Sequence, residues 1–431
     1  MQLKYFLPDW EDRLDPDFNF VTDKYSKKHD ADPYNYDIYA HQLFDKPPYD
    51  GILFSLSVFQ SKLTLKNGND ETYTIRNHAN IRDYLKIPKD SSLKIMGDCG
   101  AFGYVKEKAP PLPFYSVENV SNIYDKLGFD YGVSVDHLVV DYLMVKDEKT
   151  GKKIKKSLPK KEKDERIKIT LKNAKNFLKL HDKEKYNFTP IGVAQGYDID
   201  TYRESVKSLV EMGYEYIALG GLVQYKSDFI IGILKEIQPF IKGINVHLFG
   251  VLRPSYLNDF ENFGVTSFDS ASFLRKAWLR SGQNYLAPNG KWYAAIRVPQ
   301  AANPRLLKHA KLNGFSIDDL VKMEKDALQA LNKFDKGKID ADTALNIILK
   351  YDDLLLRGSN DGENLKEKYM QTLLDQPWKS CNCNVCREIG INVIIFRGTN
   401  RNKRRGFHNT WTFREIANNI NLDMREDNAN I

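Results

Sequence analysis

The chain has 431 residues, of which 42% are hydrophobic and 28% are charged, a composition typical of a soluble globular protein. Its 64 Lys and Arg against 57 Asp and Glu give a formal net charge of +7, which permits a polyanionic partner without requiring one. No run of about 18 apolar residues occurs, and the N-terminus lacks the apolar core of a secretory signal, so we expect a cytoplasmic protein with no membrane partner.

Eight short, almost continuously apolar runs alternate with polar and amphipathic helical sequence. They lie at 4–8, 51–57, 94–100, 131–136, 189–196, 216–222, 245–251 and 266–270. Strands buried on both faces of a parallel sheet have this character. The alternation predicts an α/β fold, a (β/α)₈ TIM-like barrel that we assign to residues 1–300 as the catalytic domain. An open doubly wound sheet is the alternative.

A strongly basic segment follows the fourth of these runs. Residues 152–168 contain nine Lys or Arg and three Asp or Glu. In a barrel this segment would extend a loop on the face that carries the catalytic residues. It is either a solvated loop or a flap that contacts phosphate groups.

The chain changes character beyond the barrel. Residues 301–376 have a helical pattern without parallel-strand runs, and residues 377–431 contain a cysteine cluster, a basic arm and a closing helix near 412–420. We interpret the first part as a helical insertion and the second as a C-terminal zinc-binding subdomain.

Three of the four cysteines lie within six residues, which is no disulfide framework. Cys381, Cys383 and Cys386 can supply three thiolates to a tetrahedral zinc ion, and His408 is the nearest downstream histidine for the fourth position. Such a site has no open position, so the predicted Zn²⁺ is structural. The alternative is three free thiols in a loop.

Three acidic residues follow predicted strands. Asp98, Asp136 and Asp269 stand at the ends of the third, fourth and eighth runs, where barrel strands converge on one mouth. A carboxylate there can act as a nucleophile, as a base or as a hydrogen-bond acceptor for a nucleobase, whereas its alternative role is to cap a helix. Gln195-Gly196 and Gly220-Gly221 end other strands, and these glycines leave room for a flat ring.

An ordered set of short motifs carries a resemblance to a known family. The motifs are GDCGAF (97–102), SVD (134–136), VAQG (193–196), LGGL (219–222), FGV (249–251), SFDS (267–270) and CNCNVC (381–386) with His408. In this order they resemble the tRNA-guanine transglycosylase superfamily. The N-terminal YFLPDWEDRLDPDF and the late RGTNRNKRRGFHN look most like its DNA-guanine transglycosylase branch.

This resemblance implies exchange of guanine in DNA for a free 7-deazaguanine base, such as 7-cyano-7-deazaguanine, in DNA modification. It implies Asp269 as the nucleophile that forms a covalent glycosyl intermediate and Asp98 as the general acid/base. The residues that it implies for base binding are Asp136, Gln195, Gly196, Gly220 and Gly221. Carboxylate attack on an oxocarbenium-like sugar carbon is sound chemistry.

The basic arm beside the cysteine cluster is a candidate for nucleic-acid binding, or else a solvated face. Its residues are Arg397, Arg401, Lys403, Arg404 and Arg405. The target guanosine would have to be flipped out of a duplex. Alternatives to the DNA enzyme are a tRNA-guanine transglycosylase, a non-catalytic nucleic-acid-binding subunit and an unrelated barrel glycosidase. A homodimer and a helper protein that opens the duplex both remain open.

Overall fold

A computed structural model describes residues 3–66, 72–147, 150–356 and 365–418. The chain divides into two compact units. Unit 1 comprises Met1–Glu11 and Tyr49–Ala271, and unit 2 comprises Asp12–Pro48 and Ser272–Ile431. We describe each unit by itself.

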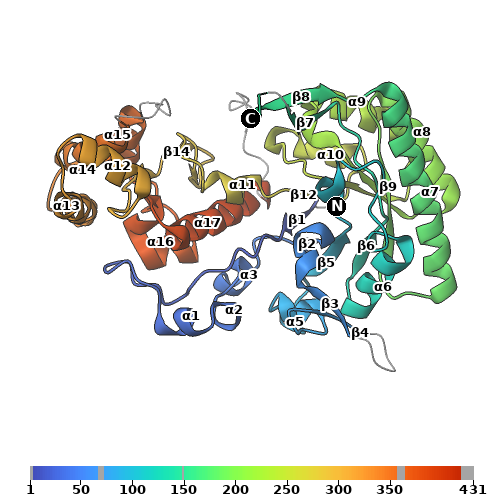
Figure 1. Ribbon diagram of the computed structural model, residues 1–431, viewed down its shortest axis with the longest axis horizontal. Coiled ribbons are helices and arrows are strands. Elements are labelled where there is room, and N and C mark those ends of the chain that lie inside the picture. The colour runs from blue at the N-terminus through green and yellow to red at the C-terminus, as the bar shows by residue number, and fades with distance from the viewer. Residues whose placement is uncertain (1–2, 67–71, 148–149, 357–364, 419–431) are drawn as a thin grey trace. The chain divides into compact units, whose positions relative to one another are not determined.

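Eight parallel strands of unit 1 form a closed barrel (Figure 1). In ring order they are β1 (Lys4–Pro8), β2 (Gly51–Ser55), β5 (Lys94–Asp98), β6 (Tyr131–Val133), β9 (Thr189–Ala194), β10 (Tyr216–Leu219), β11 (Asn245–Leu248) and β12 (Ser267–Asp269). Each strand lies within one of the eight predicted apolar runs. The predicted TIM-like barrel is therefore confirmed, and the open-sheet alternative is wrong.

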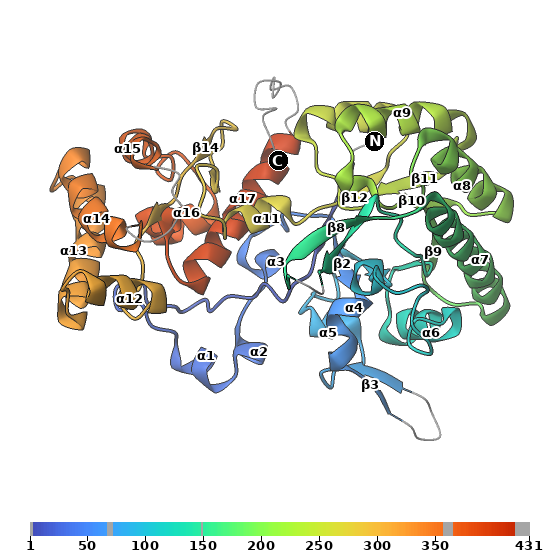
Figure 2. The same ribbon diagram turned by 45° about the horizontal axis from the view of Figure 1, so that its top comes forward.

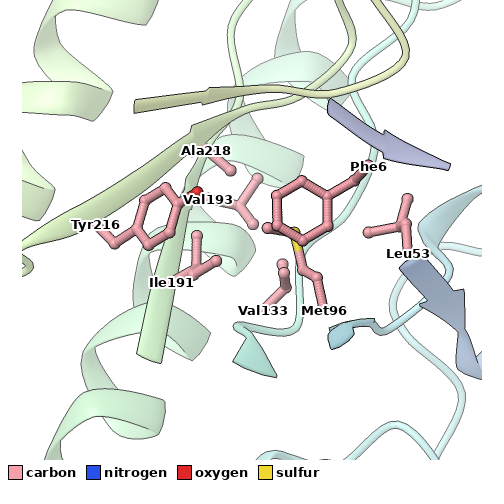
Figure 3. Packing of buried hydrophobic residues seen from close by; sticks show 8 residues of the cluster. All are labelled: Phe6, Leu53, Met96, Val133, Ile191, Val193, Tyr216 and Ala218. Carbon is pink, nitrogen blue, oxygen red and sulfur yellow. The ribbon is translucent and has the colours of Figure 1, made fainter. Parts of the chain in front are cut away.

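The interior of the barrel is filled with apolar side chains from successive strands (Figure 3). Inward-facing positions alternate along each strand, so β9 contributes Ile191 and Val193 and β10 contributes Tyr216 and Ala218. Phe6 from β1, Leu53 from β2, Met96 from β5 and Val133 from β6 complete the cluster. This packed core holds the ends of the strands in position, and with them the functional side chains that follow the strands.

Helices connect the strands. They are α4 (Leu56–Phe59), α5 (Ile81–Tyr84), α6 (Val117–Leu127), α7 (Lys160–Glu184), α8 (Ile199–Met212), α9 (Ser227–Ile237) and α10 (Leu257–Asn262). Helix α8 buries Tyr202, Val206 and Leu209 on its apolar face. It ends at Gly213, whose φ of 97° is the left-handed conformation that glycine adopts without strain.

Two antiparallel hairpins stand outside the ring of barrel strands: β3 (Leu63–Lys66) with β4 (Thr72–Ile75), and β7 (Tyr142–Lys146) with β8 (Lys153–Ser157) (Figure 2). The second hairpin corrects the sequence interpretation of residues 152–168 as a loop. That segment supplies one strand of the hairpin and the first turns of α7. Its lysines obscured the strand pattern because every residue of β8 is exposed to solvent.

Unit 2 is mostly helical. Its helices are α1 (Lys27–Ala31), α2 (Pro33–Tyr36), α3 (Ala40–Leu43), α11 (Ser272–Lys276), α12 (Pro304–Leu312), α13 (Ile317–Asp335), α14 (Ala341–Leu356), α15 (Lys366–Asp375), α16 (Asn384–Ile389) and α17 (Thr399–Asn418). Short strand pairs join β13 (Tyr285–Leu286) to β14 (Trp292–Tyr293) and β15 (Ile296–Arg297) to β16 (Ile395–Phe396). Helices are present at 301–376, as predicted.

The compact units do not follow the expected boundaries at 300 and 376. Residues 12–48 join unit 2 through contacts with the C-terminal part of the chain: Asn384 donates to the carbonyl of Leu43 (3.0 Å), and Asn400 donates to that of Asp15 (3.1 Å). Such contacts join residues more than 300 positions apart, so the order of motifs along the chain does not reveal them. No helix in the described part of the chain is long and apolar enough to span a membrane.

Candidate active site and metal centre

Three carboxylates gather at the carboxyl ends of the barrel strands. Asp98 is the last residue of β5, Asp269 is the last residue of β12, and Asp136 lies three positions beyond the end of β6. The strands are parallel, so these ends share one rim of the barrel. The negative charges of Asp136 and Asp269 both act to raise the pKa of Asp98.

Asp98 has the protonation behaviour of an acid/base group. Burial raises its pKa to about 7, and the negative charges of Asp136 and Asp269 act in the same direction. Hydrogen bonds from the Gly100 amide and from Ser55 oppose the rise. A carboxyl with this pKa is present in both protonation states near neutral pH, so it can either donate or accept a proton.

Asp269 is buried, and its two carboxylate oxygens differ in their hydrogen bonding. Oδ1 accepts hydrogen bonds from the Gly250 amide (2.9 Å) and from His247 Nε2 (3.2 Å). Within the described residues, Oδ2 accepts none. One oxygen is thus held in place while the other remains available for reaction.

His247 is the functional candidate that the sequence analysis missed. It is fully buried on β11, and its Nδ1 lies 2.7 Å from Ser267 Oγ, which in turn lies 2.6 Å from the Tyr216 hydroxyl. A carboxylate only accepts, so Nε2 donates to Asp269 and Nδ1 can accept from Ser267. A histidine inside the apolar run NVHL was the signal available in the sequence.

Asp136 and Gln195 form a second buried polar group. Gln195 Nε2 donates to Asp136 Oδ2 (2.6 Å), and Val139 N donates to Gln195 Oε1 (3.2 Å). The Cys99 side chain is buried, and its Sγ lies 3.2 Å from Asp136 Oδ1. Burial raises the pKa of Asp136, and the bonds from Cys99 and Gln195 oppose that rise.

The glycines predicted at this site leave space for these side chains. A Cβ at Gly220 would lie 2.2 Å from Gln195 Nε2, and Gly221 has a φ of 74°. A Cβ at Gly196 would lie 2.7 Å from the Tyr202 ring. The bonds of Asp136 and Asp269 described above reach neighbouring strands and loops of the barrel, which the helix-capping alternative does not explain.

The structure brings the four predicted metal ligands together in unit 2. Cys381, Cys383, Cys386 and His408 are buried, and their ligand atoms all lie within 4.8 Å of one another. The three sulfur atoms lie 3.7, 3.3 and 3.4 Å from His408 Nδ1. A tetrahedral Zn²⁺ with ordinary bond lengths separates sulfur from nitrogen by about 3.5 Å.

The surroundings of His408 also fit a metal ligand. Its Nε2 donates to the carbonyl of Leu286 (2.7 Å), which leaves Nδ1 free to bind the ion, and Tyr285 stacks on its ring. The cluster could therefore hold zinc with four protein ligands and no open position. When bound, the ion would join the turn at α16 to helix α17, and it would take no part in a reaction.

The predicted basic arm is not an arm. Residues 399–418 form helix α17, which begins well before the expected 412, and Arg397, Arg401, Arg404 and Arg405 are buried in unit 2. These arginines donate to carboxylates or to main-chain carbonyls. Neither interpretation of this run, as a phosphate-binding arm or as a solvated face, holds for the four arginines. Their guanidinium groups are buried and bond to partners inside unit 2, so they are not accessible to phosphate.

Arg405 is the clearest case. It donates to the carbonyls of Val393 (3.1 Å) and Ile395 (3.2 Å), and burial lowers its pKa to about 9. Lys403 is only half-buried, and its ammonium group contacts the carbonyl of Arg13. The arginines are thus part of the core of unit 2.

Comparison with known proteins identifies the family of the chain. The family model for queuine tRNA-ribosyltransferase matches residues 134–429. A DNA-guanine transglycosylase from Salmonella montevideo is 39% identical over 418 residues, which cover 95% of each chain. The chain therefore belongs to the queuine tRNA-ribosyltransferase family and is a glycosyltransferase of the guanine transglycosylase type.

Proposed function

We propose that this enzyme exchanges guanine in DNA for a free 7-deazaguanine base, such as 7-cyano-7-deazaguanine, through a covalent intermediate on Asp269. The observation that carries the proposal is the asymmetry of the Asp269 carboxylate. His247 and Gly250 hold Oδ1, which leaves Oδ2 to attack. DNA is favoured as substrate because the relative that matches along 95% of both chains is named a DNA-guanine transglycosylase.

The first half-reaction would break the bond between the sugar and guanine. Asp269 Oδ2 attacks C1′ of the deoxyribose, the C1′–N9 bond breaks with its electron pair moving to the base, and an ester between Asp269 and C1′ forms. Asp98 in its protonated form supplies the proton that the departing base takes up. Its pKa of about 7 supports this role.

The second half-reaction runs the same chemistry in reverse. The N9 of the incoming base attacks C1′, the ester bond breaks and the Asp269 carboxylate is restored. Asp98 accepts the proton that the incoming base releases, so both residues return to their starting states. His247 acts as a positioning residue, because it touches Asp269 and keeps the reactive oxygen oriented.

Base recognition is proposed for Asp136, Gln195, Gly196, Gly220 and Gly221. Asp136 and Gln195 already bond to each other, so each enters the site with a fixed orientation. Replacement of N7 by carbon leaves the Watson–Crick edge unchanged, so the same donors and acceptors can serve guanine and the incoming base. The target nucleoside must leave the helix for its C1′ to be reached.

The decisive experiment offers labelled guanine to the enzyme with either duplex DNA or tRNA. Incorporation into DNA is expected, and incorporation into tRNA alone would overturn the proposed substrate. Absence of exchange with both, under conditions in which the enzyme is folded and loaded with zinc, would favour the non-catalytic alternative.

A further inference from the structure

The hairpin β7–β8, residues 142–157, forms an exposed basic surface that the proposed chemistry does not use; we call it the lysine ribbon. It follows barrel strand β6 and the Asp136 segment, and it leads into helix α7. It therefore leaves the barrel at the rim that carries the three carboxylates. Its sequence contains six lysines and two acidic residues, and residues 148–149 at its turn lie outside the described part.

The pairing of the strands places the lysines of one face together. Lys146 lies opposite Lys153, Met144 opposite Lys155, and Tyr142 opposite Ser157. Directly opposed residues and alternate residues along a strand share a face. All six side chains are exposed. The Lys155 ammonium lies 4.4 Å from the centroid of the Tyr142 ring.

This arrangement costs stability when the ribbon is alone. Like charges directly opposite each other in a hairpin are unfavourable. A two-stranded ribbon gains little from burial, and no side chain of β7 or β8 is fully buried. Within the described residues, no carboxylate forms an ion pair with Lys146, Lys153 or Lys155, whereas nearby Lys163 pairs with Asp141 at 2.6 Å. An anionic partner between the lysines would offset the repulsion.

We propose that this face of the lysine ribbon binds the sugar–phosphate backbone of the DNA that carries the target guanine; this inference rests on the proposed function. Phosphates are the anions that unpaired lysines bind irrespective of sequence. Tyr142 adds an aromatic surface of the kind on which an unpaired base stacks. In this proposal the lysine ribbon, and not the buried arginines of α17, positions the DNA strand.

The test compares two sets of three substitutions with the same change in charge. The ribbon variant carries Lys146→Ala, Lys153→Ala and Lys155→Ala. The control variant carries Lys172→Ala, Lys175→Ala and Lys179→Ala, which are exposed lysines on helix α7. Binding to a fluorescein-labelled DNA duplex is measured by anisotropy at several salt concentrations, with labelled tRNA in parallel, and guanine exchange is measured as a function of DNA concentration.

The ribbon variant is expected to bind DNA with a log–log salt dependence that is shallower by about 2–3, because each phosphate contact contributes about 0.9 to the slope. The KM for DNA should rise by about tenfold or more, while exchange at saturating DNA falls much less, and the control should behave as wild type. Equal binding by the ribbon and control variants would overturn the proposal. So would weakened binding of tRNA with unchanged binding of DNA. A wild-type enzyme that binds DNA through the ribbon but exchanges no base would refute the proposed function alone.

Discussion

Removal of the imidazole of His247 should slow formation of the covalent intermediate. In His247→Leu the Asp269 carboxylate loses one of the two donors on Oδ1, and only the Gly250 amide still holds that oxygen. Leucine fills much of the buried volume between Phe6 and Phe249, whose rings lie 5.9 and 4.8 Å from the imidazole. The substitution therefore weakens the orientation of the Asp269 carboxylate more than it disturbs the packing of the core.

The size of the effect follows from the bond that is lost. A hydrogen bond to a charged group contributes about 1.5–3 kcal/mol. If that contribution is needed to align Oδ2 with C1′, the single-turnover rate falls by about 10- to 150-fold at 1.4 kcal/mol per factor of ten. His247→Gln keeps an N–H donor that can reach Asp269, so it should recover part of the rate.

Rapid-quench measurement of adduct formation, together with thermal unfolding, distinguishes orientation from damage to the core. We expect His247→Leu to be slow, His247→Gln to be intermediate, and both to have a KM for guanine near that of wild type. Ser267→Ala removes the contacts of the Ser267 hydroxyl with His247 and Tyr216 but leaves both donors on Asp269, so it serves as the control for loss of buried polar contacts. Equal rates in His247→Leu and wild type would refute the positioning role, and equal losses in the leucine and glutamine variants would indicate a packing effect.

The other predictions concern acid/base chemistry, base binding and the metal. The folded-state pKa of Asp98 is raised to about 7 from an ordinary 3.8. Between these two pH values the native state binds more protons than the unfolded state. The free energy of unfolding should therefore fall as pH rises from about 4 to about 7. Asp98→Asn should flatten that fall in urea titrations and abolish exchange; an unchanged pH profile of stability would contradict the assigned pKa. Gly220→Ala places a Cβ 2.2 Å from Gln195 Nε2 and so breaks the buried bond from Gln195 to Asp136. The KM for free guanine should rise by about tenfold or more. An unchanged KM would contradict a role of Gln195 in base binding. About one zinc per chain is expected by elemental analysis. Cys383→Ser should lower both zinc content and melting temperature, and a variant that keeps both would refute the metal centre.

Much of the barrel could be predicted because its signal is local. Strands buried on both faces need continuous apolar sequence, and the strand-end carboxylates follow those runs directly, so Asp98, Asp136 and Asp269 could be chosen without coordinates. The cysteine spacing was equally local. His408 required a partner at a distance, and the structure places it with the three thiols.

The features that escaped prediction depend on contacts between distant parts of the chain. The run at 397–405 looks solvated by charge alone, yet Asp23 and Glu388 pair with its arginines and allow them to be buried. The allocation of residues 12–48 to unit 2 has the same origin. His247 was hidden because a lone polar residue in an apolar strand gives no indication of which carboxylate it meets.

The most direct test of the account is to identify the residue that carries the covalent intermediate. Enzyme incubated with duplex DNA and no incoming base should be denatured, digested and examined by peptide mass spectrometry. We predict a deoxyribosyl adduct on the peptide that contains Asp269, and none in Asp269→Asn, whose amide cannot form the ester. An adduct on another residue, or an adduct that persists in the Asp269→Asn variant, would contradict the central claim.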